Sequence, residues 1–186
     1  MKSLESGIAP LIREVTEVFD RMPADALAPL VNAIMEADRI LLYGQGRTGL
    51  VMQGLTMRLY HLGLDAHWVG AMATPPLGKD GLFLVNAARA DLPTALALMN
   101  SARNAGAKIA LIAGVEQGPA HGLADIALHL PAQTMAESPN EAGSRMPMGS
   151  QYEAALFFLC ERLVLDLVAR LGTDFKVMQQ RHTNLL

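Results

Sequence analysis

A glycine-rich turn that follows the first apolar run is the part of this sequence whose spacing most directly suggests chemistry. Gly44, Gly46 and Gly49 come after the letters LLY in the pattern G-x-G-x-x-G and lead into a periodic helical segment. Such glycines allow a tight strand-to-helix turn, and the N–H groups and dipole at the helix start favour an anion such as phosphate. Arg47 adds a cation that the dipole at a helix N-terminus does not favour, so it is either an anion's partner or a solvated side chain. The alternative is that the glycines only form the turn and Thr48 only caps the helix.

A dinucleotide suits this turn less well than a single phosphate does. A dinucleotide site would require an acid about 20 residues further on, at the end of the second strand, to hold the ribose hydroxyls. The sequence has VGAMAT there, and Asp65 lies before that strand. A nucleotide-binding oxidoreductase is therefore a third hypothesis, which an absence of NAD binding would exclude.

The segment MGSQYEAALFFLCERL places an acid at the start of the longest helical pattern. Ser150 and Glu153 have the spacing of a capping box, in which the serine caps the helix and the glutamate bonds back to it. The functional alternative is that Glu153 faces a cleft and acts as a general base. The cap is the more common use of this spacing, and both interpretations stay open at this point.

Two of the five histidines lie where they could take part in proton transfer. His61 follows the glycine turn on the same predicted helix, and His182 lies in the tail QRHTNLL. Each has a simpler interpretation, since a helical histidine is most often a buried residue with a satisfied hydrogen bond and a tail histidine is most often solvated. His67, His121 and His129 share no spacing typical of a metal site, so the sequence predicts no metal.

The elements that must position these residues alternate along the chain. From residue 39 onward, short apolar runs and longer periodic segments follow one another, which is typical of βαβ units and a parallel sheet. Two helical patterns come first, the second starting at Pro23. The expected strands are 40–43, 66–69, 82–85, 109–112 and 126–130, and the expected helices are about 48–62, 92–105, 118–123 and 150–171.

This order predicts an α/β fold, a flavodoxin-like doubly wound three-layer sandwich with a five-stranded parallel sheet flanked by helices. We expect the 186 residues to form one domain. Its parts are N-terminal helices (1–36), a βα core (37–130), a loop (131–149) and C-terminal helices (150–186). The loop is long for a compact domain and rich in turn-forming residues.

Composition narrows the possible functions. Of the residues, 51% are hydrophobic and 18% are charged, which excludes a predominantly disordered chain. The formal charge is −3 with both signs scattered, so we expect neither nucleic acid nor a membrane surface as partner. The lone Cys160 excludes an intrachain disulfide. The N-terminus lacks a signal-peptide pattern and no uncharged apolar stretch could span a membrane, so we expect a cytoplasmic protein whose surplus apolar residues lie in a core or in subunit contacts.

Four longer segments extend these motifs: GQGRTGLVMQGLTMRLYHLGL, VGAMATPPLGKDGLFLV, PMGSQYEAALFFL and MQQRHTNLL. Together they resemble the sugar isomerase (SIS) domain family, most closely its 6-phospho-3-hexuloisomerases, in the family's order and spacing from Tyr43 to the C-terminus. The resemblance implies a five-stranded parallel sheet and a homo-oligomer, either a dimer or a tetramer. It also implies a phosphosugar ligand and the reversible conversion of a 3-hexulose 6-phosphate into fructose 6-phosphate.

Matched residue by residue, the resemblance implies roles for the residues singled out above. The family's first phosphate-side loop corresponds to residues 46–49, its proposed base to Glu153, and its C-terminal histidine, which reaches a neighbouring subunit's cleft, to His182. His61 corresponds to the histidine of the family's M-R-L-x-H-L-G segment. In the implied reaction Glu153 moves a carbon-bound proton through a cis-enediolate, and His182 or His61 moves the oxygen-bound proton. Such chemistry needs neither a metal nor a redox cofactor.

The sequence departs from the family after the third predicted strand, where the family has Ser-Gly-Ser-Gly-Glu-Thr as its main phosphate cradle. Residues 86–91 read NAARAD, so two serine hydroxyls and two glycines are missing. Asn86 and Arg89 are the remaining candidate phosphate ligands, and Asp91 would repel a dianion unless Arg89 neutralises it. Each lost hydrogen bond to a charged group costs about 1.5–3 kcal/mol. The chain is therefore either an isomerase in which Arg89 compensates, or a non-catalytic SIS-type protein that binds or senses a sugar phosphate.

Overall fold

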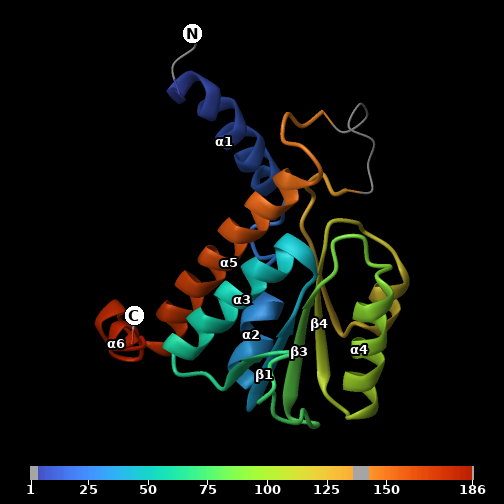
Figure 1. Cartoon of the computed structure of the whole chain (residues 1–186), viewed down its shortest axis with the longest axis vertical. Helices are drawn as coiled ribbons and strands as arrows, with labels where there is room; N and C mark the ends of the chain where they lie inside the picture. Colours follow the sequence, from blue (N-terminus) through green and yellow to red (C-terminus); the bar gives the residue numbers. More distant parts are fainter. Residues whose placement is uncertain (1–3, 136–142, 186) are drawn as a thin grey trace.

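A computed structural model describes residues 4–135 and 143–185, and it has two helices followed by alternating strands and helices (Figure 1). In chain order the elements are α1 (Leu4–Asp20), α2 (Ala28–Glu36), β1 (Arg39–Tyr43), α3 (Gly46–His61), β2 (Ala66–Trp68), β3 (Gly81–Asn86), α4 (Pro93–Asn104), β4 (Lys108–Ala113), the 3₁₀ helix η1 (Pro119–Leu123), β5 (Ile126–His129), α5 (Ser150–Leu171) and α6 (Phe175–Gln180). Part of the predicted loop, residues 136–142, lies outside the described residues.

The described strands form a parallel sheet in the order β2-β1-β3-β4-β5. In the centre, Leu42 of β1 pairs with Leu84 of β3, which in turn pairs with Ala110 of β4. The central strand β3 is buried along its whole length because helices cover both faces of the sheet. The strand order reverses between β1 and β3, which makes the sheet doubly wound and confirms the predicted fold class.

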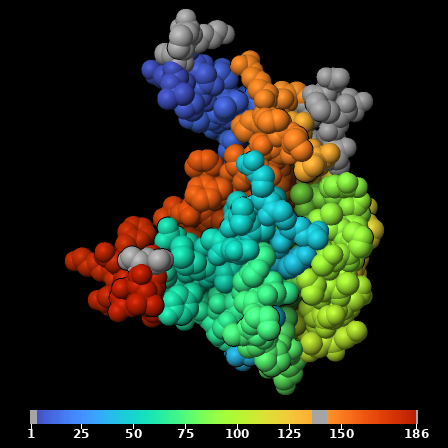
Figure 2. Space-filling view, viewed as in Figure 1, coloured from blue at the N-terminus to red at the C-terminus, as the bar shows by residue number. Residues whose placement is uncertain are grey.

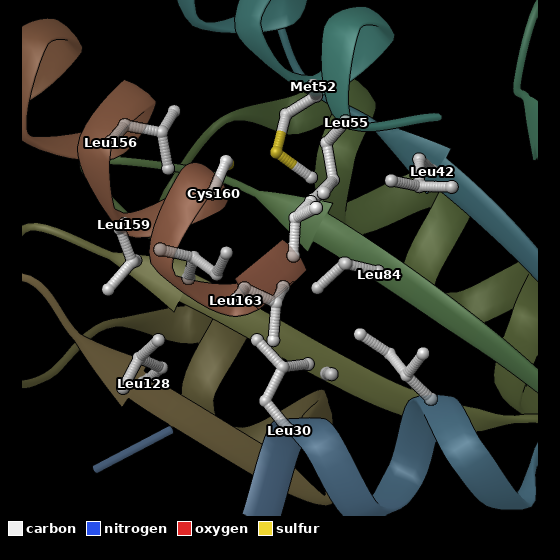
Figure 3. Packing of buried hydrophobic residues seen from close by; sticks show 14 of the residues in the cluster. Leu30, Leu42, Met52, Leu55, Leu84, Leu128, Leu156, Leu159, Cys160 and Leu163 are labelled. Atoms are coloured by element: carbon white, nitrogen blue, oxygen red, sulfur yellow. The ribbon is translucent and has the colours of Figure 1, made fainter. Parts of the chain in front are cut away.

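One face of the sheet packs against α2, α3 and α5 (Figure 3). Met52 and Leu55 of α3 and Leu163 of α5 meet Leu84 of β3, and Leu30 of α2 closes the same cluster. All five side chains are at most 2% exposed, so truncating any of the leucines would cost about 2–5 kcal/mol. Helix α5 is buried on several sides, as its apolar pattern predicts.

The other face packs against α4 and η1. Phe83 and Val85 of β3 and Leu111 of β4 meet Ala95 and Met99 of α4 in a second buried cluster. The small side chains on α4 let this helix lie close to the sheet. Together the two clusters give the three layers that the sequence predicts: helices, sheet and helices.

Helices α1 and α6 stand out from the α/β body (Figure 2). Helix α1 packs against α5 through its C-terminal half, where Val15 and Val18 are buried, whereas Leu4, Ile8 and Ile12 nearer its start are exposed. Within residues 4–135 and 143–185, no helix is both long and apolar enough to cross a membrane.

The start of the second helix differs from the expectation. The sequence suggested a start at Pro23, but residues 24–27 form turns, and the Ala26 N–H donates to the Pro23 carbonyl oxygen. Helix α2 begins at Ala28, with Pro29 in its first turn. A helix running from Pro23 would place Pro29 in its interior, where proline has no N–H to donate and clashes with the preceding turn.

Candidate active site

A pocket of about 230 Å³ lies at the carboxyl edge of the sheet, beside the point where the strand order reverses. Ligands of doubly wound sheets bind in this crevice. Its walls come from the β1–α3 turn, the β3–α4 loop and the residues around the start of α5. The lining includes five residues singled out from the sequence: Gly46, Arg47, Thr48, Arg89 and Glu153. The fold thus brings together predicted residues from three separate places in the chain.

The glycine turn leaves the start of α3 open. Gly46 has a φ of 58°, and a Cβ on Gly49 would lie 2.7 Å from the carbonyl oxygen of Gly44, so both positions favour glycine. The Thr48 hydroxyl donates a hydrogen bond to the Gln45 carbonyl oxygen at 2.8 Å, and the Gln45 side chain makes no capping hydrogen bond. The interpretation of Thr48 as a helix cap is therefore wrong. The first N–H groups of α3 have no partner within the helix and are suited to an anion.

The carboxylate of Glu153 contacts the guanidinium of Arg47 in the pocket. Its Oε2 lies 2.7 Å from Arg47 Nε, while the Glu153 side chain is 16% exposed and that of Arg47 is 74% exposed. Oε2 is buried and accepts no hydrogen bond within the described residues. No N–H of Arg47 points at Oε2, so the two groups form an ion pair without a hydrogen bond. A largely buried carboxylate with an unused lone pair beside a cation can accept a proton from a bound molecule.

The predicted capping box at the start of α5 is wrong. The residue before the helix is Gly149, with a φ of 77°, and no side chain caps it. Ser150 lies inside the first turn, and its N–H donates to the Pro147 carbonyl oxygen at 2.9 Å. The chain enters the helix through two left-handed residues, Met148 and Gly149, which moves Ser150 out of the cap position. This entry leaves the Glu153 side chain free to face Arg47.

The β3–α4 loop, residues 86–91, keeps a turn that can face an anion. Arg89 Nη2 lies 2.9 Å from Asp91 Oδ2, so the acid that would repel phosphate is paired. Ala90 is fully buried and has a φ of 57°, so the loop retains one left-handed residue without a glycine. The backbone N–H groups of Ala88 and Arg89 make no hydrogen bond within the described residues, and both residues line the pocket.

Asn86 lies beneath the pocket rather than on its surface. It is 1% exposed, and its Nδ2 donates to the Tyr152 hydroxyl at 2.7 Å. Burial raises the pKa of Tyr152 well above its usual range, so this phenol stays neutral. Tyr152 itself lines the pocket. Asn86 therefore supports the pocket wall through Tyr152 and is not among the residues that line the pocket, while its direct contact with phosphate stays a prediction.

His61 and His182 lie together, but at the C-terminal end of α3. Their ring centroids are 5.2 Å apart, beside a separate pocket of about 380 Å³. Burial, and then the charges of His182 and Arg58, lower the pKa of His61. At a rise of about 1.5 Å per residue, Arg47 and His61 are about 20 Å apart along the helix. Within one chain, the histidines and Glu153 do not form one site.

Several lining residues were not anticipated. Tyr152, Thr134, Met148 and Gly149 also line the pocket, and all but Tyr152 belong to the loop between β5 and α5. The path of a long aperiodic loop has no local signal in the sequence, although a glycine directly before a helix could have indicated Gly149 as a turn. Over the described ranges, no three His, Cys, Asp or Glu side chains converge as metal ligands would.

Comparisons with known proteins place these features in context. No family model matches the chain. It is 27% identical over the whole length of both chains to the 3-hexulose-6-phosphate isomerase of Bacillus subtilis. It is 30% identical to that of Methylomonas aminofaciens, over 97% of this chain and 94% of the relative. A solved structure from Methanococcus jannaschii, from which the function of a 3-hexulose-6-phosphate isomerase was inferred, superposes with a TM-score of 0.84 and 25% identity, covering 97% of this chain and 99% of the other.

Proposed function

Because this chain belongs to the sugar isomerase (SIS) domain family, and because relatives 30% identical to it are named 3-hexulose-6-phosphate isomerase, we propose that it interconverts 3-hexulose 6-phosphate and fructose 6-phosphate. The observation that carries the proposal is the largely buried carboxylate of Glu153, which is paired with Arg47 in a pocket that also contains the open start of α3. An acid, a cation and free N–H groups around one small cavity fit a phosphorylated sugar that must lose and regain a proton.

The phosphate of the substrate would bind at the start of α3. The N–H groups of residues 46–48 and the dipole of this helix favour a dianion, and the exposed Arg47 side chain adds a positive charge. The N–H groups of Ala88 and Arg89, which have no hydrogen-bond partner among the described residues, would supply donors from the facing loop. These backbone donors would take over part of the role of the missing serine hydroxyls.

Glu153 would act as the base. Its carboxylate removes the proton from the hydroxyl-bearing carbon beside the carbonyl, which gives a cis-enediolate, and returns the proton to the neighbouring carbon. The guanidinium of Arg47, 2.7 Å from the carboxylate, lies where it can stabilise the negative charge that moves onto the enediolate oxygens. One base above two adjacent carbons is sufficient for this exchange.

The oxygen-bound proton would be moved by a histidine from a second copy of the chain, in a dimer or tetramer. His182 is exposed, whereas His61 is 3% exposed, so His182 is the better candidate to reach a neighbour. Exposed apolar side chains on α1 and α5, among them Ile12 and Phe158, are consistent with contacts between subunits. A homo-oligomer would explain why two groups needed for one reaction lie about 20 Å apart in one chain.

The direct test is the Glu153→Gln variant in an assay that couples isomerisation of 3-hexulose 6-phosphate to detection of fructose 6-phosphate. We expect kcat to fall by about 1,000-fold or more, because the amide cannot accept the proton. Glu116→Gln, which makes the same change at a side chain that is 80% exposed, should retain activity. Unchanged turnover in Glu153→Gln would remove this residue from the mechanism.

A second candidate function is non-catalytic binding of a sugar phosphate. It is favoured by the altered loop at residues 86–91, where Arg89 is already paired with Asp91. Thermal unfolding of the wild-type chain with and without fructose 6-phosphate separates the two functions. Stabilisation by the sugar phosphate together with the absence of turnover would establish binding without catalysis.

A further inference from the structure

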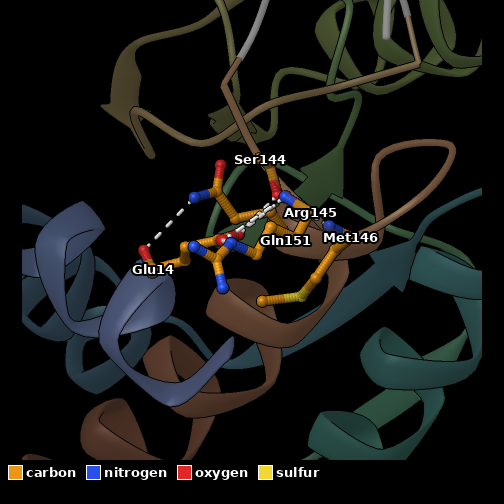
Figure 4. A network of polar contacts seen from close by, with 5 residues as sticks. All are labelled: Glu14, Ser144, Arg145, Met146 and Gln151. Atoms are coloured by element: carbon orange, nitrogen blue, oxygen red, sulfur yellow. Dashed lines mark hydrogen bonds and ion pairs between the residues drawn. The ribbon is translucent and has the colours of Figure 1, made fainter. Parts of the chain in front are cut away.

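One acid of the protruding helix α1 holds the segment that leads into α5 (Figure 4). Glu14 Oε2 accepts a hydrogen bond from the Ser144 hydroxyl at 2.8 Å and another from the Arg145 backbone N–H at 3.1 Å. The Arg145 guanidinium lies 3.7 Å from Glu14 Oε1. The carbonyl oxygen of Glu14 accepts a further hydrogen bond from Gln151 Nε2 at 3.2 Å. A single residue of α1 therefore contacts the chain on both sides of the start of α5.

The groups that contact Glu14 are themselves tied to the loop. The Ser144 hydroxyl also accepts a hydrogen bond from the Met146 N–H at 3.1 Å, which fixes the turn after Ser144. The Gln151 side chain accepts a hydrogen bond from the Gln133 N–H at 2.8 Å, so it bridges α1 and the start of the same loop. Glu14 thus lies at the centre of a network that joins the two ends of the loop to α1 and α5.

Between these anchored points lies the strained part of the loop. Met148 has a φ of 53° and Gly149 a φ of 77°, and both line the pocket. A left-handed methionine is strained and persists only where the surroundings fix it. Gly149 is also packed tightly, since a Cβ there would lie 2.9 Å from Met135 N. This pair of residues sets the direction of the first turn of α5, which carries Glu153.

We propose that Glu14 is a positioning residue for the isomerase reaction: by holding Ser144, Arg145 and Gln151, it keeps the entry to α5 in the conformation that directs Glu153 toward Arg47. The proposal rests on the proposed function of the pocket. Glu14 does not line that pocket and acts through the loop.

The contacts explain why an ionised carboxylate suits this place. The Glu14 side chain is 15% exposed, and its two oxygens receive a hydroxyl, a backbone N–H and a guanidinium. Glutamine keeps one acceptor oxygen and puts an NH₂ group in the place of the other, so it can satisfy only some of these donors. Alanine satisfies none, and the partly buried donors lose their partner.

The experiment compares Glu14→Ala, Glu14→Gln and Ser144→Ala with Glu17→Gln, which removes one charge from an exposed position one turn further along α1. Two readouts are used: kcat and KM for 3-hexulose 6-phosphate, and hydrogen–deuterium exchange of the peptide that spans residues 143–150. We expect Glu14→Ala to lower kcat by about 10–100-fold with a smaller change in KM, because a displaced base is less effective. In the Glu14→Ala variant, the backbone amides of residues 143–150 should exchange at least about 10-fold faster than in the wild-type chain. Glu14→Gln and Ser144→Ala should show smaller changes in both readouts, and Glu17→Gln should show neither.

The two readouts separate the inference from the function on which it rests. Faster exchange and lower kcat in Glu14→Ala support the positioning role. Unchanged exchange, or faster exchange with unchanged kcat, overturns it. If the wild-type chain has no isomerase activity, the proposed function and the positioning role fail together, while the exchange data still decide whether Glu14 orders the loop. If Glu14→Ala does not fold, Ser144→Ala decides in the same way, since it removes one donor and leaves the carboxylate.

Discussion

The residues that the sequence suggests for proton transfer lie in two groups, one at each end of α3. The surroundings of the two groups differ. The N-terminal end opens into a pocket with the glycine turn, Arg47 and Glu153. The C-terminal end carries His61, whose ring lies near that of His182 at an angle of 34°, with Arg58 beside the same pocket. About 20 Å of helix separates them. Both groups belong to one predicted mechanism, but a single chain does not bring them together.

The helix itself accounts for part of this difference. Its N-terminus presents free N–H groups and the positive end of the dipole, so an anionic substrate is favoured there. Its C-terminus favours cations, but burial opposes a charge on His61 and lowers the pKa of this histidine. The proposed phosphate site and the proposed base therefore both lie at the first end. The second end can contribute only if a neighbouring chain presents it to that pocket.

Among the variants that test whether the two ends of α3 act in one reaction, His182→Ala is expected to have the largest effect. If His182 moves the oxygen-bound proton, kcat should fall by about 100-fold or more. Mixing this variant with Glu153→Gln should then restore activity. In randomly mixed dimers, half the molecules contain one of each chain and one of their two sites is intact, so recovery reaches about a quarter of the wild-type value.

The control for this experiment is each variant re-mixed with itself, which should recover nothing. Subunit exchange is checked by mass spectrometry of isotope-labelled chains. Full exchange without recovered activity would mean that the two ends of α3 do not meet across a subunit boundary.

A smaller effect is expected from a matched pair of arginines on α3. Arg47→Ala removes the cation beside Glu153 and should lower kcat/KM by about 10–100-fold, the value of about one interaction with a charged group. Arg58→Ala makes the same change near the histidines and should alter kcat/KM by no more than about 3-fold. Steady-state kinetics on both variants checks this. Equal losses would show that both ends of the helix contribute to binding the substrate.

Most of the fold was predictable because its signals are local. Each strand is a short apolar run, and each helix repeats apolar residues at the helical spacing, so their order and the doubly wound sheet follow from the chain alone. The start of α2 was misplaced because Pro23 and Pro29 are both plausible first-turn residues. Only the requirement that Pro29 avoid a helix interior decides between them.

The site was predictable where its residues are close in sequence, and much less so where a long loop brings them together. Gly46, Arg47 and Thr48 lie in one short segment, and all three line the pocket, whereas Gly49 packs against the backbone of Gly44 and is not among the lining residues. The Ser150–Glu153 spacing suggested a capping box, because nothing nearby shows that the chain enters α5 in a left-handed conformation. The support of Tyr152 by Asn86 joins residues on different elements and leaves no pattern in the sequence.

The smallest expected effect concerns stability at the histidine end. Because the pKa of His61 is lowered from 6.5 in the folded chain, the unfolded chain takes up a proton first as the pH falls. The stability that neutral His61 contributes is therefore complete above pH 6.5 and is lost as the pH falls through the folded-state pKa. Urea unfolding between about pH 7.5 and 5 should show a decline that His61→Gln reduces. His182→Ala removes a neighbouring charge but leaves His61 buried, and burial is the larger cause, so this variant should keep most of the decline. If both variants abolished the decline in stability equally, its main cause would be charge repulsion between the two histidine rings and not the burial of His61.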